Sequence, residues 1–202
     1  MKFENEALIV IDMQNDFFYG GSLAVPLAND ILVSINKLMN GFDTVIFTQD
    51  WHPQNHSSFA SQHPKLDNYS VVEMSYGQQI LWPDHCVQGS KGAEFNCDLN
   101  VNKAQLIVRK GFNPGIDSYS AFYENDRVTS TGLCGFLKEK EIKKIILVGL
   151  ALDFCVNFTA LDGISLGFKV EVIKSLCRGI NIDNSLQVAL DDMTRAGVYI
   201  SG

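Results

Sequence analysis

Short apolar runs alternate with amphipathic segments along this chain. Runs with many β-branched residues predict strands over residues 7–12, 44–49, 104–109, 144–149, 168–173 and 198–201. Apolar residues recur at helical spacing in residues 29–40, 131–141, 155–166 and 184–196, which predicts a helix in each segment. Residues 50–103 hold most of the histidine, proline and asparagine, and are expected to form long loops around short elements.

The order of these elements predicts the fold class. Strands that alternate with helices form a parallel sheet with helices on both of its faces, so the chain is expected to have an α/β fold. With 202 residues, of which 46% are hydrophobic, the chain can bury one sizeable core. A single domain over residues 1–202 is therefore expected.

Four residues with reactive or charged side chains follow predicted strands. Asp12 ends the first strand, Asp50 the second and Lys110 the third, and Cys155 follows the strand at 144–149 by a short loop. Ligands bind outside the carboxyl ends of the strands in open parallel sheets. These four side chains are therefore expected at one edge of the sheet, where they could form a site.

Three of them could act together in nucleophilic catalysis. Cys155 begins a predicted helix, whose N-terminus lowers the pKa of a thiol and offers N–H groups to an oxyanion. Asp12 could act as the general base, and an ammonium at Lys110 would favour both charged partners. Taken alone, each has a structural interpretation: a buried cysteine, a loop cap and a solvated lysine.

A second group of residues suggests a metal site. Asp50 and His52 are two residues apart, so they point the same way on an extended segment, and His56 and His85 follow. Imidazole and carboxylate ligands suit one divalent ion, zinc by default, with iron or manganese also compatible. The alternative is scattered loop histidines, and His63 is interpreted as a surface residue.

Charge and targeting signals limit the partners. The net charge is −7 and basic residues do not cluster, which argues against binding to nucleic acids or anionic membranes. The first apolar run, residues 7–11, is too short for a signal peptide or a membrane span, so a cytoplasmic location is expected. The five cysteines form no disulfide framework, and the sequence leaves the choice between monomer and homo-oligomer open.

Five blocks in order, IDMQNDFFYGGSLAV, QDWHPQNHSSF, WPDHCVQGSKGAEF, RKGFNPGIDSYSAF and VGLALDFCV, together resemble the nicotinamidase/pyrazinamidase group of the isochorismatase-like hydrolases. The resemblance covers nearly the whole chain and implies a three-layer α/β/α fold with a six-stranded, mostly parallel sheet. It also implies site residues. The catalytic triad is Asp12, Lys110 and Cys155, the metal ligands are Asp50, His52 and His85 with His56 as a possible fourth, and the walls of a pyridine pocket are Phe17, Leu23, Trp82 and Tyr119.

The resemblance further implies an oxyanion hole made by the backbone N–H groups of Ala151 and Cys155, and a cis peptide bond between Ala151 and Leu152. The family usually has threonine at position 152 and often tyrosine at 154, where this chain has Leu152 and Phe154.

The implied reaction is hydrolysis of nicotinamide to nicotinate and ammonia in NAD salvage, with pyrazinamide as a further substrate. The substrate ring nitrogen would bind the metal, and Cys155 would form a thioester. Two alternatives stay open. One is an amidohydrolase of the same superfamily that acts on an acyclic ureido or carbamoyl amide, and the other is a non-catalytic ligand-binding protein on the same fold.

Overall fold

A six-stranded parallel sheet forms the centre of the computed structural model, which describes residues 5–202. Its strands are β1 (Glu6–Ile11), β2 (Thr44–Asp50), β5 (Leu106–Lys110), β6 (Lys144–Leu150), β7 (Lys169–Arg178) and β8 (Tyr199–Ser201). They lie in the order β5-β2-β1-β6-β7-β8, and each neighbouring pair is parallel. The expected parallel α/β sheet is therefore confirmed.

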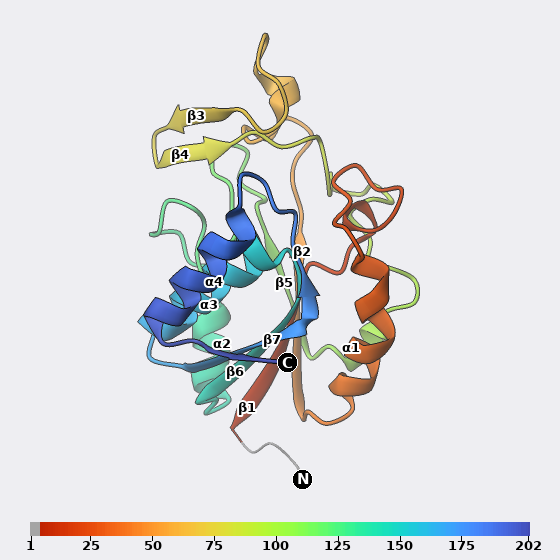
Figure 1. The fold of residues 1–202 in the computed structure, drawn as a ribbon, viewed down its shortest axis with the longest axis vertical. Helices are drawn as coiled ribbons and strands as arrows, with labels where there is room; N and C mark the ends of the chain where they lie inside the picture. The colour runs from red at the N-terminus through yellow and green to blue at the C-terminus, as the bar shows by residue number, and fades with distance from the viewer. Residues whose placement is uncertain (1–4) are drawn as a thin grey trace.

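Helices cover both faces of this sheet. Helix α1 (Leu32–Met39) lies on one face, and α2 (Leu133–Glu139), α3 (Asn157–Ser165) and α4 (Ser185–Ala196) lie on the other (Figure 1). Strand β1 shows why both faces need a cover, since Ala7, Ile9 and Ile11 pack into one core cluster while the alternate Leu8 and Val10 pack into the other. The predicted three-layer α/β/α fold is confirmed.

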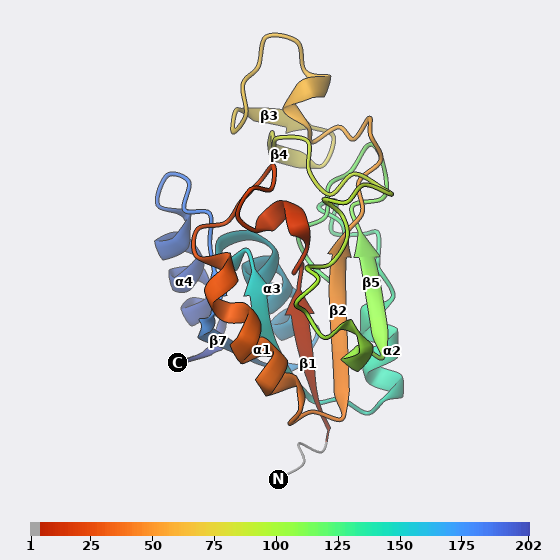
Figure 2. The same ribbon diagram turned by 90° about the vertical axis from the view of Figure 1, so that its right-hand side faces the viewer.

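The carboxyl ends of the strands face a small antiparallel hairpin. Strands β3 (Val71–Met74) and β4 (Gly77–Ile80) pair with each other, and Figure 2 shows the arrowheads of β1, β2 and β5 pointing toward them. The region expected to be irregular therefore contains this one sheet. It also contains two short 3₁₀ turns, Ala60–Gln62 and Val101–Lys103.

Several element boundaries differ from the prediction for local reasons. Helix α1 is preceded by a 3₁₀ turn, Ala28–Ile31, because Leu27 adopts a left-handed conformation just before it. Strand β7 continues to Arg178 because its second half, where polar residues interrupt the apolar run, pairs with Gly149 and Leu150. A further 3₁₀ turn, Asn15–Phe17, follows β1.

The described residues also bear on membrane-spanning helices and disulfide bonds. Within residues 5–202, no helix is long and apolar enough to span a membrane. All five cysteines lie in this range as free thiols, as expected.

Candidate active site

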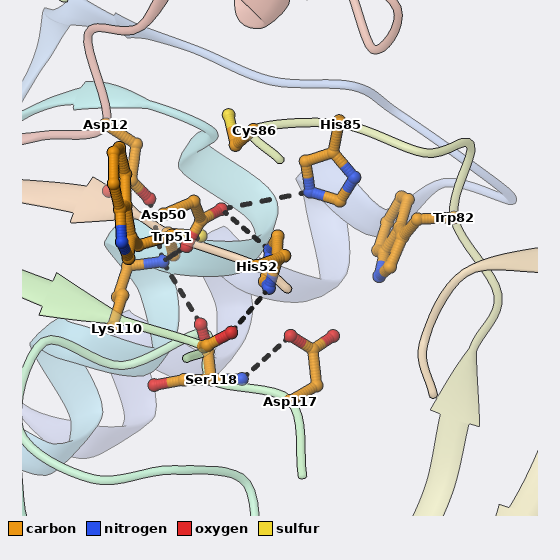
Figure 3. A network of polar contacts seen from close by, with 12 residues as sticks. Asp12, Asp50, Trp51, His52, Trp82, His85, Cys86, Lys110, Asp117 and Ser118 are labelled. Carbon is orange, nitrogen blue, oxygen red and sulfur yellow. Dashed lines mark hydrogen bonds and ion pairs between the residues drawn. The ribbon is translucent and has the colours of Figure 1, made fainter. Parts of the chain in front are cut away.

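The side chain of Lys110 contacts the three other residues that follow strands, Asp12, Asp50 and Cys155. Its Nζ lies 2.9 Å from Asp12 Oδ2, donates to the Ser118 carbonyl at 3.1 Å and forms an ion pair with Asp50 Oδ1 (Figure 3). It also donates to Cys155 Sγ at 3.4 Å. The four residues that the sequence placed at one sheet edge are therefore in contact.

The charge of Lys110 depends on these neighbours, because its side chain is fully buried. Burial alone would lower the pKa of this ammonium, but the carboxylates of Asp12 and Asp50 raise it well above its usual value. Lys110 therefore stays protonated and balances two buried negative charges. The interpretation of Lys110 as a solvated surface lysine does not hold.

Asp12 lies one residue beyond β1 and is also fully buried. Its Oδ1 accepts a hydrogen bond of 2.6 Å from the Thr48 hydroxyl, while Oδ2 makes the ion pair with Lys110. Burial raises the pKa of Asp12 to about 6, although Lys110 opposes this shift. A carboxylate with such a pKa can take up and release a proton near neutral pH.

Cys155 lies in a π-helical turn, Leu152–Val156, that precedes α3. Its Sγ lies within 4.8 Å of a carboxylate oxygen of Asp12. Burial, with the carboxylates of Asp12 and Asp50, raises the pKa of this thiol well above its usual value, and Lys110 only partly opposes the shift. The predicted lowering of the thiol pKa is therefore wrong for this structure, because desolvation outweighs the positive charge nearby.

Asp50, His52 and His85 form a buried group whose ligand atoms all lie within 4.8 Å of one another. The Nε2 atoms of His52 and His85 lie 3.7 and 3.9 Å from Asp50 Oδ2 (Figure 3). Each Nδ1 is hydrogen-bonded to a backbone carbonyl, at Gly111 for His52 and at Pro83 for His85. The Nδ1 atoms therefore carry the hydrogens, and both Nε2 lone pairs face the carboxylate, as metal ligands require.

The protonation of two members of this group suits a cation. The third, His52, has a pKa that burial would lower but that Asp50 raises above its usual value, so a bound ion must displace a proton there. Lys110 and His52 lower the pKa of Asp50 below its usual value against the effect of burial, so the carboxylate is ionised. Burial and then His52 lower the pKa of His85 to about 4, which leaves its imidazole neutral. A neutral imidazole and an ionised carboxylate can both bind a divalent ion without losing a proton.

His56 lies beside this group. Its ring lies 4.4 Å from that of His52, but its Nδ1 is hydrogen-bonded to Ser58 and its Nε2 lies 3.3 Å from the Ile116 carbonyl. It shares a possible ligand group with His52 and Asp117, whereas Asp50 and His85 do not belong to that group. The structure thus gives His56 a different orientation from the other histidines.

A pocket opens above the thiol and the metal group. Its walls include all four predicted substrate contacts, Phe17, Leu23, Trp82 and Tyr119. The space between the lining atoms, with its open mouth included, is about 330 Å³. The indole N–H of Trp82 donates to the Tyr119 hydroxyl at 3.0 Å, which fixes two of the aromatic walls relative to each other.

The turn between β6 and Cys155 corrects one prediction. The cis peptide bond joins Leu150 and Ala151, one bond earlier than expected. Leu152 already begins the π-helical turn, so the change of chain direction falls at the end of β6, before the helical residues. Ala151 and Cys155 both line the pocket, as an oxyanion hole made by their N–H groups would require.

Two further residues line the pocket that the sequence analysis did not name, Asp117 and Ile180, and Phe154, named there only as a departure from the family pattern, lines it as well. Asp117 belongs to one of the quoted blocks, which is the signal the sequence offers for it, and the structure adds that its carboxylate is buried. Ile180 comes from the loop after β7 and carries no chemical signal in the sequence.

Cys86 and His63 make their hydrogen bonds away from Lys110 and Cys155. The amide of Cys86 donates to Asp16 Oδ2 at 2.7 Å, and burial raises the pKa of its thiol well above the usual value. His63 is half-buried, with its Nε2 bonded to the Ser57 carbonyl.

Comparison with known proteins agrees with this geometry. The family model described as "Isochorismatase domain" matches residues 6–202. A curated nicotinamidase of Acinetobacter baylyi is 51% identical over 96% of this chain and 91% of its own length. A solved nicotinamidase/pyrazinamidase of Acinetobacter baumanii, 50% identical, superposes with a TM-score of 0.98 over 100% of this chain and 97% of that one.

Two solved relatives contain ligands. The yeast nicotinamidase bound to the inhibitor nicotinaldehyde is 30% identical, with a TM-score of 0.91 over 97% of this chain and 99% of that one. The pyrazinamidase of Pyrococcus horikoshii in complex with zinc is 33% identical, with a TM-score of 0.78 over 97% and 98%. These matches confirm the resemblance drawn from the five sequence blocks, and the chain belongs to the isochorismatase family.

Proposed function

We propose that this protein is a nicotinamidase, which hydrolyses nicotinamide to nicotinate and ammonia in NAD salvage, and pyrazinamide in the same way. One observation carries the proposal: Lys110 connects a thiol and two carboxylates, one of which belongs to a group suited to bind a metal, beneath an aromatic pocket. The similarity to curated nicotinamidases over 96% of the chain supports the substrate. We place the reaction in a single cytoplasmic domain over residues 1–202.

The first step forms a thioester on Cys155. Because the thiol is neutral at rest, Asp12 accepts its proton as sulfur attacks the carboxamide carbon, and Lys110 stabilises the charge that passes between them. Asp12 suits this role, since its carboxylate lies beside the thiol and its Oδ2 forms the ion pair with Lys110. Asp12 then gives the proton to the departing amine, so the C–N bond breaks and ammonia leaves.

The second step hydrolyses the thioester. Asp12, again ionised, accepts a proton from a water molecule whose oxygen attacks the acyl carbon. The C–S bond then breaks, nicotinate forms, and the proton returns to the Cys155 sulfur. In both steps the substrate oxygen becomes negative, and we assign its stabilisation to the backbone N–H groups of Ala151 and Cys155 beside the pocket.

Asp50, His52 and His85 would hold the divalent ion, with zinc as the expected metal. When bound, such an ion supplies a Lewis acid that can hold a lone-pair donor of the substrate or of water. The protein fixes its side of this site, because both Nδ1 atoms are tied to backbone carbonyls and the Asp50 carboxylate is ionised by Lys110. His56 remains a candidate fourth ligand, or a neighbour that contacts the ion through water.

The pocket walls fit a flat aromatic amide better than an acyclic one. Phe17, Leu23, Trp82 and Tyr119 offer mainly apolar surface to a ring, while Cys155 and Ala151 lie at the same cavity. An acyclic ureido amide would leave this surface without a partner. The structure therefore gives no observation in favour of that alternative.

Ammonia release from nicotinamide tests the proposal. Wild-type protein loaded with zinc should release ammonia from nicotinamide and, at a far lower rate, from an acyclic ureido amide. Cys155→Ala should abolish release while its zinc content stays normal, because the thiol contacts Lys110 rather than the histidines. Equal activity on the acyclic amide, or full activity of Cys155→Ala, would overturn the proposal.

A further inference from the structure

The hydrogen bonding between β1 and β2 changes where the two strands end. Their backbones pair in register from Ala7 with Thr44 to Val10 with Phe47. Beyond this point, hydrogen bonds from backbone to side chain replace the backbone pairing. The Asp12 amide donates to the Thr48 hydroxyl at 3.1 Å, and the Asp50 amide donates to the side chain of Gln14. The residues that this region must hold in place are Asp12 and Asp50, which belong to the proposed site.

Gln14 binds the backbone of Asp50 with both ends of its amide. Its Oε1 accepts the Asp50 N–H at 2.7 Å, and its Nε2 donates to the Asp50 carbonyl at 2.7 Å and to the Ala93 carbonyl at 2.9 Å. These contacts fix the orientation of the amide, because the oxygen faces a donor and the nitrogen faces two acceptors. The side chain is fully buried, and no other role in the site has been assigned to it.

The contact matters because Asp50 serves two groups at once. Its carboxylate contacts Lys110 through Oδ1 and faces both histidines through Oδ2, so a small rotation would disturb both arrangements. Ala93 follows the segment that carries His85, and Gln14 also forms an isolated backbone bridge with Phe95. The amide thus links the strand that carries Asp50 to the loop that follows His85.

We infer that Gln14 is a positioning residue for the metal site, which holds Asp50 in the orientation needed to bind a divalent cation. This inference rests on the proposed function only in taking Asp50, His52 and His85 as the ligands. Partners that orient metal ligands commonly contribute tenfold to a hundredfold in metal affinity. Gln14 does so through the backbone of Asp50, on the side where β1 no longer supplies a backbone partner.

Gln49 provides a matched control. Its Nε2 also donates to the Ala93 carbonyl, at 2.8 Å, and its side chain is buried as well. Its Oε1 accepts from Arg109, whereas both backbone groups of Asp50 are bonded to Gln14. Gln14→Met and Gln49→Met therefore remove the same donor from Ala93, but only the first removes the contacts with Asp50.

The test measures zinc affinity by competition with a chromogenic chelator, together with urea unfolding of each zinc-free protein. We expect Gln14→Met to bind zinc at least about tenfold more weakly than wild type, and Gln49→Met to bind within about twofold of it. Gln14→Asn, whose shorter amide cannot reach Asp50 and Ala93 together, should also weaken binding and replaces Gln14→Met if that variant does not unfold cooperatively.

Equal zinc affinity of the Gln14 variants and Gln49→Met overturns the inference, whether both bind normally or both bind weakly. Failure of the proposed function has a different signature. In that case wild type binds zinc and the Gln14 variants lose it, yet nicotinamide is not hydrolysed.

Discussion

Lys110 shows how much of the site depends on one side chain. It is a fully buried cation with two buried carboxylates within contact distance, so neither sign of charge is stable there without the other. Removing one member of a buried ion pair leaves an uncompensated charge, which costs about 3–5 kcal/mol.

Lys110→Met is therefore expected to lower the free energy of unfolding by about 3 kcal/mol or more, measured by urea denaturation near pH 8, where both carboxylates should ionise. Lys138→Met is the control, because Lys138 is exposed at the end of α2, and its loss should change stability by less than about 0.5 kcal/mol. Equal stability of the two variants would show that Lys110 is not a structural counter-ion.

The pKa of Asp12 predicts the acid limb of the activity profile. Asp12 must be ionised to accept the thiol proton, and burial raises its pKa to about 6. kcat/KM for nicotinamide should therefore be constant above about pH 7 and fall about tenfold for each pH unit below about 6. The rate is measured in buffers of constant ionic strength with excess zinc. A flat profile down to about pH 4.5 would contradict the role of Asp12 as the base.

The histidines are predicted to differ in their effect on metal binding. His52→Ala should lose bound zinc and ammonia release together, because its Nε2 faces the Asp50 carboxylate. His63→Ala should keep both, since the His63 ring bonds the Ser57 carbonyl instead. Metal analysis after gel filtration, alongside the ammonia assay, checks the pair. Retention of zinc by His52→Ala would remove His52 from the site.

Site residues with a charged or nucleophilic side chain could be predicted from the sequence. Asp12, Lys110 and Cys155 follow apolar strands, and the topology of a parallel sheet is enough to bring them together. Thr48 and Gln14 could not be predicted in this way, because their importance comes from what they contact. The raised thiol pKa of Cys155 was missed for a related reason, since desolvation depends on the packed structure and not on the helix alone.

At the scale of elements, the end of β6 is the most constrained part of the fold. Gly149 has a φ of +114°, and a Cβ at this position would lie 2.3 Å from the Ile11 carbonyl oxygen. Strands β1 and β6 therefore approach each other closely just before the turn that carries Cys155. Only glycine allows this approach together with that backbone conformation.

Gly149→Ala should accordingly lower the free energy of unfolding by about 3 kcal/mol, from backbone strain and overpacking together. Gly135→Ala is the control: it lies in α2, a Cβ there meets nothing within 4 Å, and alanine should stabilise the helix by about 0.5–1 kcal/mol. Thermal unfolding of the two variants checks the contrast. A neutral Gly149→Ala would show that the two strands can separate at low cost.

The element boundaries that the sequence did not predict share a physical cause. The second half of β7 contains Lys174 and Ser175, so no apolar pattern marks it, and pairing with β6 alone makes it a strand. The hairpin of β3 and β4 has half-exposed residues and lies outside the main sheet, so its sequence carries little hydrophobic signal. The strongest predictions were the buried strands β1, β2 and β6, whose apolar runs need no tertiary partner to be recognised.

At the scale of the molecule, the fold brings three chemical functions to one edge. The Cys155 thiol comes from the turn after β6, the proposed base Asp12 from the end of β1, and the candidate metal ligands from the end of β2 and the long segment that follows it. Lys110, at the end of β5, connects them. The account therefore predicts covalent catalysis through Cys155 in a site that only the assembled sheet creates.

Mass spectrometry of zinc-loaded protein, quenched in acid during turnover of nicotinamide, tests this claim most directly. We expect a nicotinoyl thioester on the peptide that contains Cys155, absent from Cys155→Ala and from protein without substrate. Ammonia release without any such adduct, or an adduct on Cys86 instead, would contradict the account.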